Sequence, residues 1–548
     1  MCNNKISNIS VSNLIVNTLI KKGVKNVCIS PGSRNTPLTQ EFINHKDIKC
    51  YSHIDERASA YFALGIIKSI NQPVAILTTS GTAAANLLPA TIEASLNKSP
   101  LFLITADRPK KLMNTGASQT INQINLFNKY TRKMEDLDLS SKSIYKKLSA
   151  LENIFDYALG LNKQTPPGPI HLNIRFDEPL LDKEHKIDFH MKNNMKIEKK
   201  HKPVILPKFS MPVIICGPLK NTDKLNSIIK LSEKINAPIL ADTLSQLRFS
   251  KYSKNTNTCY DFYIDNLKNK PDLILRFGDK PISKNLNNFI NKNSKITFLI
   301  DEYPRFNDDC KNIIISDMKN LNKIKKTTVK NNLIDEINTL EIKASKQIKN
   351  LIYKSNSQAN IINQILQKIK DKDNIFIGSS TIIRTFDQFS GKSKVKAKML
   401  SNHITRGIDG IVSSALGMAA ANNKANNYLF IGDISLFYDL NGLHILNDNK
   451  VKLTIIAINN NGGQIFSRLP YSNDNLKEFE KFWITPLKAK IKNIAKLYNL
   501  NYFKASSDNI IKVIKKAHLK KDVSLIEVFI DNKKDMNFIK TVTDKIKI

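Results

Sequence analysis

The residues best suited to chemistry in this chain form a short acidic turn, Gly432-Asp433-Ile434-Ser435, and a later run of asparagines and glycines that includes Asn460. A carboxylate, an amide oxygen and a backbone carbonyl near Gly462 are oxygen ligands of the kind that Mg²⁺ binds, with diphosphate oxygens and water completing its octahedron. The pattern predicts a Mg²⁺ (or Mn²⁺) and diphosphate site with Asp433, Asn460 and Gly462 as ligands. A plain Gly-Asp turn in an asparagine-rich chain is the alternative.

A strand-helix-strand unit should bring these ligands together. Segments 428–431 and 452–458 are apolar runs typical of buried strands, and 436–446 between them has the apolar spacing of a helix. Such a unit is a parallel crossover. Asp433 and Asn460 each follow a strand end, so they should emerge at the edge of the sheet where open α/β sheets bind ligands.

The same alternation of strands and helices recurs along the chain, which predicts an α/β protein of three doubly wound parallel-sheet domains. We expect a first domain over 1–185, a central domain over 203–350 and a third over 356–548. The lysine-rich stretch 182–202 has little periodicity and should be a linker.

The composition excludes several classes of protein. Hydrophobic residues make up 41% of the 548, enough for real cores, which argues against a disordered chain. The net charge of +36 comes from lysines spread along the chain without a basic stripe, which argues against nucleic-acid binding. The six cysteines form no close pair, so neither a zinc site nor a disulfide framework is expected. Without a long apolar run or a signal-like start, we expect no membrane span and a cytoplasmic location.

A metal-bound diphosphate suggests thiamine diphosphate as the cofactor. Its chemistry needs a carboxyl group in a dry pocket, which hydrogen-bonds the aminopyrimidine ring and exchanges a proton with it. Glu56 is the candidate, because it follows a predicted strand and precedes the mostly apolar stretch 60–65. An acidic residue that complements the dipole of a first helical turn is the alternative explanation.

A series of long motifs runs nearly from end to end in a characteristic order. They are SPGSRNTPLT (30–39), HIDERASAYFALG (53–65), TTSGTAAANLLPA (78–90), TADRP (105–109), GASQTINQ (116–123), GPIHLNIRFDEPL (168–180), PILADTLSQLR (238–248), FGDKPISK (277–284), GSSTIIR (378–384), GIDGIVSSALG (407–417), GDISLFYDLNGL (432–443) and NNNGGQIFSRLP (459–470). In these motifs the chain resembles thiamine-diphosphate enzymes of the decarboxylase and acetolactate-synthase type. Within that group it is similar to the carboligases of menaquinone biosynthesis.

The resemblance implies a transferase that decarboxylates 2-oxoglutarate and adds the four-carbon succinyl unit to isochorismate. Both substrates are polyanions, for which Arg offers bidentate recognition and Lys a point charge. The matching motifs imply that the substrate residues are Ser33, Arg34, Arg108, Gln119, Lys284, Ser380 and Arg384. The alternatives are an acetolactate-synthase-like carboligase or decarboxylase with a different acceptor, and a non-catalytic relative.

The resemblance also implies the cofactor contacts and the assembly. Ile408 would support the aminopyrimidine, and Ile465 and Phe466 would form an apolar wall that excludes water. At least a homodimer is implied, because in this family the cofactor lies between domains of two subunits. The full set of implied cofactor residues is Glu56, Ser380, Ile408, Gly432, Asp433, Ile434, Ser435, Asn460, Gly462, Gly463, Ile465 and Phe466.

One segment departs from the family's pattern. The family has Asn-Arg-Gly ahead of its Gly-Ile-Asp-Gly motif, and that Arg contacts substrate, but here His403 stands at the position of the Arg. We expect Arg406, three residues later, to supply the missing cation through a local shift of the loop. Asn285 after Lys284 and the altered turn at 483–487 are smaller departures that also bear on the second substrate.

Overall fold

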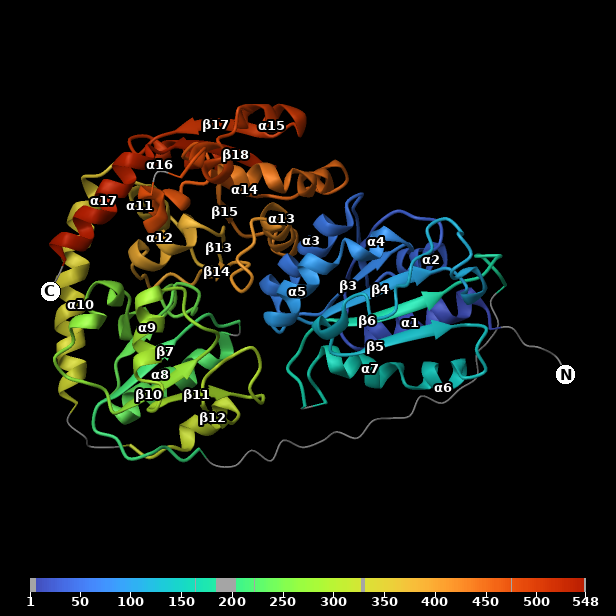
Figure 1. Ribbon diagram of the computed structural model, residues 1–548, viewed down its shortest axis with the longest axis horizontal. Coiled ribbons are helices and arrows are strands. Elements are labelled where there is room, and N and C mark those ends of the chain that lie inside the picture. The colour runs from blue at the N-terminus through green and yellow to red at the C-terminus, as the bar shows by residue number, and fades with distance from the viewer. Residues whose placement is uncertain are drawn as a thin grey trace. The chain divides into compact units, whose positions relative to one another are not determined.

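The computed structural model describes residues 6–162, 164–183, 204–220, 222–326, 331–474 and 476–546. The predicted linker over 182–202 lies outside these residues apart from its first two positions. Within the described parts, the strands form three six-stranded sheets, and all neighbouring strands run parallel. Helices flank each sheet (Figure 1). The predicted α/β fold with three parallel sheets is confirmed.

The first sheet has the order β2-β1-β3-β4-β6-β5 and is built on an aliphatic core. Its central strands are buried along their whole length, as expected for parallel strands covered on both faces. The strands are β1 (Asn26–Ile29), β2 (Lys49–Ser52), β3 (Val74–Thr78), β4 (Leu101–Asp107), β5 (Met134–Asp138) and β6 (Ile170–Arg175). The helices are α1 (Asn8–Lys21), α2 (Thr36–Asn44), α3 (Glu56–Ile70), α4 (Thr82–Ala85), α5 (Leu88–Leu96), α6 (Ile144–Ser149) and α7 (Leu151–Ala158).

The second sheet has the order β12-β11-β10-β7-β8-β9. Apolar clusters pack against it from strands and helices alike. Its strands are β7 (Pro212–Cys216), β8 (Ile239–Ala241), β9 (Thr256–Asn257), β10 (Leu273–Phe277), β11 (Thr297–Asp301) and β12 (Asn312–Ile315). The accompanying helices are α8 (Leu225–Ile235), α9 (Lys284–Lys292) and α10 (Asn332–Tyr353).

The third sheet has the order β14-β13-β15-β16-β18-β17. Its strands are β13 (Asn374–Ile377), β14 (Lys398–Leu400), β15 (Asn427–Gly432), β16 (Thr454–Asn459), β17 (Asn501–Ala505) and β18 (Ser524–Phe529). The helices of this part of the chain are α11 (Gln358–Leu366), α12 (Thr381–Phe389), α13 (Ile411–Ala421), α14 (Asp433–Tyr438), α15 (Ile491–Leu497), α16 (Ile510–His518) and α17 (Asn532–Lys545).

The chain divides into two compact units that do not follow sequence order. The first unit holds the β1–β6 sheet together with 403–422 and 439–451, and the second holds the other two sheets. In the first unit, α13 packs on α3 at two glycines. A Cβ on Gly65 would lie 1.9 Å from the Ser414 carbonyl oxygen, and one on Gly417 would lie 2.0 Å from that of Phe62. Only glycine allows the two backbones to approach this closely.

The helix predicted over 436–446 is interrupted. α14 ends at Tyr438, and a 3₁₀ helix, η8 (Leu440–Asn447), follows in the first unit. The buried Asp439 lies at the break, where its carboxylate accepts hydrogen bonds from the Ser413 N–H at 2.7 Å and the Ser413 hydroxyl at 3.0 Å. These bonds join residues far apart in the sequence, so the local apolar pattern of 436–446 does not reveal the break.

Candidate functional site

The carboxyl ends of β15 and β16 bring Asp433 and Gly462 together in the second unit. β15 ends at Gly432 and α14 begins at Asp433, whose Oδ1 accepts the Ile434 N–H at 2.8 Å. Its Oδ2 accepts the Gly462 N–H, also at 2.8 Å. Burial raises the pKa of Asp433, although these N–H groups favour the charged form. Asn460 follows β16 directly and is half-buried.

The backbone after β16 is held in a conformation that requires glycine. Gly462 has φ 114°, and a Cβ there would lie 2.4 Å from the Ile484 carbonyl oxygen. That oxygen also accepts the Gly463 N–H at 2.6 Å. A Cβ on Gly432, by contrast, would meet no atom within 4 Å apart from its chain neighbours, so the residue before Asp433 faces open space. A buried carboxylate, an asparagine amide and a backbone turn next to open space suit Mg²⁺ and a diphosphate.

The remaining predicted cofactor residues near Asp433 and Gly462 in the sequence lie in the helical turns that follow these two residues. Ile434 and Ser435 lie in the first turn of α14, and Ser435 is buried. Ile465 and Phe466 follow Gly463 and are half-buried, with Phe466 opening a short 3₁₀ helix. Among the described residues, no group of three or more His, Cys, Asp and Glu side chains could hold a metal ion. The predicted ligand set is different, because it combines one carboxylate with an asparagine amide and a backbone carbonyl.

Glu56 is the first residue of α3 in the first unit and is half-buried. The helix begins there because the Asp55 side chain accepts the Ala58 N–H at 3.0 Å. The turn after Ile408 packs against the same helix. The Tyr61 hydroxyl donates to Asp409 at 2.7 Å, and Gly410, at φ 67°, lies against the Tyr61 ring. The structure therefore places Glu56, in α3, and Ile408, next to residues that contact α3, in one unit.

Three predicted substrate residues of the first unit lie close to one another. Arg34 is buried after β1, where its guanidinium pairs with Glu178 at 3.1 Å. Arg108 follows β4, and its Nη2 donates to Gln119 at 3.3 Å. Burial and the nearby charge of Arg108 lower the pKa of Arg34. Ser33 is exposed beside Arg34.

Buried polar side chains form a hydrogen-bond network next to Arg108, and the sequence did not predict it. Asp107 accepts the Arg108 N–H at 2.8 Å and the Asn173 amide at 2.9 Å. The Arg175 guanidinium lies 3.1 Å from the Asp107 carboxylate and donates to the Arg108 carbonyl at 3.2 Å. Asn173 also accepts from Gln123 at 2.8 Å. The sequence does contain a signal, because Asn173 and Arg175 alternate with the apolar Leu172 and Ile174 in a strand-like segment.

The other predicted substrate residues lie in the second unit. Ser380 caps α12 with a left-handed backbone of φ 69°, and Arg384 Nη1 donates to the Ser380 carbonyl at 2.6 Å. Lys284 is exposed as the first residue of α9. The structure thus joins Ser380 and Arg384 on one helix and places Lys284 at the start of another.

The loop around His403, which departs from the family's pattern, is hydrogen-bonded to a buried carboxylate. Thr405 donates to Glu93 through its N–H at 2.9 Å and its hydroxyl at 2.8 Å, and Lys68 pairs with the same carboxylate at 3.0 Å. Glu93 is fully buried, so the loop is held to α5. Arg406 next to it is exposed, with φ 53°, and its Nε donates to the His403 carbonyl at 3.4 Å.

Comparisons with known proteins identify the family of the chain. Three family models match successive parts of the chain: the N-terminal TPP binding domain of thiamine pyrophosphate enzymes at 9–126, their middle domain at 184–377 and their C-terminal TPP binding domain at 388–528. The chain belongs to the thiamine pyrophosphate (thiamine diphosphate) enzymes, and its fold is theirs.

Similarity to individual proteins shows to which family of thiamine pyrophosphate enzymes the chain belongs. The chain is 32% identical over 556 residues to the 2-succinyl-5-enolpyruvyl-6-hydroxy-3-cyclohexene-1-carboxylate synthase of Oceanobacillus iheyensis. The match covers 95% of each of the two chains. The chain is also 35% identical over 535 residues to the synthase of the same name from Staphylococcus aureus, covering 94% of this chain and 92% of the relative. The chain belongs to this family of synthases. Within the described residues, no helix has the length and apolar character to cross a membrane.

Proposed function

We propose that this enzyme decarboxylates 2-oxoglutarate and joins the four-carbon succinyl unit to isochorismate. The product would be 2-succinyl-5-enolpyruvyl-6-hydroxy-3-cyclohexene-1-carboxylate, an intermediate of menaquinone biosynthesis. The observation that carries the proposal is the near full-length similarity to synthases of that name. Asp433 and Gly462 at the carboxyl edge of a parallel sheet support it, because the motif that marks the cofactor site forms a compact corner here.

Each group of predicted residues has one task in this proposal. Thiamine diphosphate supplies the electron sink for decarboxylation. Asp433, Asn460 and the backbone at Gly462 hold its metal, Mg²⁺ or Mn²⁺, and its diphosphate. Glu56 holds the proton exchanged with the aminopyrimidine, and Ile465 with Phe466 excludes water.

The substrate residues fall into two sets. The first set, Ser33, Arg34, Arg108 and Gln119 of the first unit, offers a cationic and polar surface for carboxylates. The second set, also suited to anions, consists of Lys284, Ser380 and Arg384. Arg406 is proposed as a further cation for the second substrate, in place of the arginine that His403 replaces.

Product identification tests the proposal. The purified protein is mixed with thiamine diphosphate, Mg²⁺ and 2-oxoglutarate, with and without isochorismate, and the products are identified by mass spectrometry. We expect the condensed product in the complete mixture. Rapid CO₂ release without isochorismate, or a preference for pyruvate when it replaces 2-oxoglutarate, would instead indicate an acetolactate-synthase-like carboligase or a simple 2-oxo-acid decarboxylase.

We further propose that the enzyme acts as at least a homodimer in the cytoplasm, with each cofactor held between subunits. Mixing two inactive variants, Glu56→Gln and Asp433→Ala, tests the shared site, because a mixed dimer would contain one intact combination. Restored activity supports the proposal. If the two variants carry different affinity tags and copurify as mixed dimers but no activity returns, both residues of a site would lie in one chain.

A further inference from the structure

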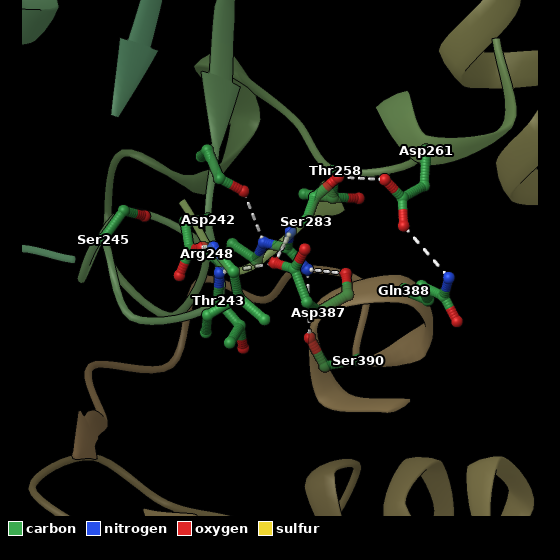
Figure 2. A network of polar contacts seen from close by, with 12 residues as sticks. Asp242, Thr243, Ser245, Arg248, Thr258, Asp261, Ser283, Asp387, Gln388 and Ser390 are labelled. Atoms are coloured by element: carbon green, nitrogen blue, oxygen red, sulfur yellow. Dashed lines mark hydrogen bonds and ion pairs between the residues drawn. The ribbon is translucent and has the colours of Figure 1, made fainter. Parts of the chain in front are cut away.

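A buried ion pair joins the central domain to α12 in the second unit. Arg248 is fully buried and its Nη2 lies 2.8 Å from Asp387 Oδ1, which is also buried (Figure 2). Arg248 Nη1 donates to the Asp387 carbonyl at 2.6 Å, and its Nε donates to the Ala241 carbonyl at 2.7 Å. The Tyr260 hydroxyl donates to Asp387 at 3.0 Å. One guanidinium therefore fixes both the side chain and the main chain of Asp387.

The same pair is connected to the start of α9. Asp387 Oδ1 accepts the Thr243 N–H at 3.0 Å. The adjoining Asp242 accepts the Ile282 N–H at 2.7 Å, immediately ahead of the N-cap Ser283. Lys284 is the next residue. A short chain of bonds thus runs from α12 through 242–243 to the beginning of α9.

A second bridge joins the same two helices. Asp261 accepts the Ser283 hydroxyl through Oδ1 and the Gln388 side-chain amide at 3.0 Å through Oδ2 (Figure 2). Ser283 caps α9 by accepting the Leu286 N–H at 2.9 Å. The two bridges together fix α9 and α12 against one another at two neighbouring positions of α12, Asp387 and Gln388.

We propose that Asp387 and Arg248 are positioning residues that set the separation of Lys284 on α9 from Ser380 and Arg384 on α12. The proposal rests on the proposed function, in which those three residues bind the anionic substrates. Lys284 and Arg384 have exposed side chains, so their spacing depends on how their helices are held. Charges that recognise a polyanion must be preorganised, and such groups need support from a surrounding set of bonds.

Stability alone does not require this arrangement. Burying a guanidinium and carboxylates costs desolvation energy, and well-packed apolar residues often serve packing equally well. The bonds instead give a fixed geometry, because Arg248 donates to Ala241, Tyr260, Ser390 and two groups of Asp387.

The test compares Asp387→Asn with a matched control. We expect Asp387→Asn to raise the KM of at least one of the two substrates about tenfold, equivalent to ~1.4 kcal/mol of binding, with the Kd of thiamine diphosphate unchanged. Asp373→Asn is the control. Asp373 is a buried carboxylate that accepts the Lys370 N–H at 2.8 Å, but it lies at the opposite, amino end of β13. Its KM values should stay within about twofold of the parent.

Tyr260→Phe provides a milder variant if Asp387→Asn fails to fold. It removes a hydroxyl that contacts both Arg248 and Asp387, and should raise the same KM by a smaller factor with parental circular dichroism. Crystal structures of the parent and the folded variant should show a changed distance between the Cα atoms of Lys284 and Arg384.

The outcomes separate the two proposals. A parent protein that makes no condensed product overturns the proposed function. An active parent whose Asp387→Asn or Tyr260→Phe variant keeps parental KM values, or shows the same loss as Asp373→Asn, overturns the positioning role alone.

Discussion

The buried carboxylate of Glu93 offers a sharp test of how this chain holds the loop ahead of Ile408. Glu93 accepts hydrogen bonds from Lys68 and from two groups of Thr405, at 3.0, 2.9 and 2.8 Å. Replacing Glu93 by Gln keeps the shape but removes the charge. Glu93 accepts from Lys68 through Oε1 and from both Thr405 groups through Oε2, and the amide nitrogen of Gln cannot accept, so the bonds at one of these two atoms are lost. Because the buried Lys68 side chain also loses its counter-charge, unfolding of the first unit should become easier by about 3 kcal/mol.

Calorimetry measures this effect. For a unit of this size, about 3 kcal/mol corresponds to a fall of roughly 6–12 °C in the unfolding midpoint. The matched control is Asp156→Asn, which removes the partner of Lys22 in a partly exposed ion pair of 2.6 Å in the same unit. Such pairs contribute about 1 kcal/mol or less, so its midpoint should fall by only a few degrees.

The pH dependence gives a second, independent measurement. Although burial opposes ionisation, Lys68, His403 and the Thr405 N–H hold the pKa of Glu93 below its ordinary value of 4.5. A lowered carboxyl pKa adds stability that is complete above 4.5 and is lost as the pH falls through the lower folded-state value. The difference between parent and Glu93→Gln should therefore shrink below about pH 4. A difference that is constant with pH, or no larger than that of Asp156→Asn, would refute the reasoning.

The remaining predictions concern the candidate site. Glu56→Gln should bind thiamine diphosphate with parental affinity yet lose about 10²–10⁴-fold in kcat, and near-parental turnover would exclude its role in proton exchange. Asp433→Ala should abolish the Mg²⁺-dependent part of cofactor binding measured by calorimetry, and removal of the metal by a chelator should do the same to the parent. Unchanged affinity in Asp433→Ala would refute the metal assignment. Arg108→Met should raise the KM of at least one substrate about tenfold or more. Lys111→Met, which removes an exposed cation paired with Asp177 nearby, should not, and equal effects would point to general surface charge.

The parts of this molecule that the sequence predicts are those built from neighbouring residues. Asp433 follows one strand and Gly462 the next, and the parallel crossover between those strands suffices to bring them together, as the bond of 2.8 Å shows. The alternation of apolar strands and amphipathic helices likewise predicts three parallel sheets.

What the sequence hides are charges that pair across long stretches of chain. Nothing near Arg248 or Glu93 in the sequence distinguishes a buried charge from a surface one, because their partners Asp387 and Thr405 lie far along the chain. The broken helix at Asp439 has the same cause, since its bonds to Ser413 depend on the tertiary fold. The assignments of catalytic, cofactor and substrate residues are proposals for the experiments above.

The contact between α3 and α13 has a consequence for how this chain can diverge. Gly65 faces the Ser414 backbone and Gly417 faces the Phe62 backbone. No side chain at these contacts could change in size to compensate for a mutation. The other residues of both helices are mostly buried too, but each of them has a side chain that a substitution can change. At Gly65 and Gly417, however, only glycine fits. A methyl group at either position would push α3, which begins with Glu56, away from α13, which follows Ile408.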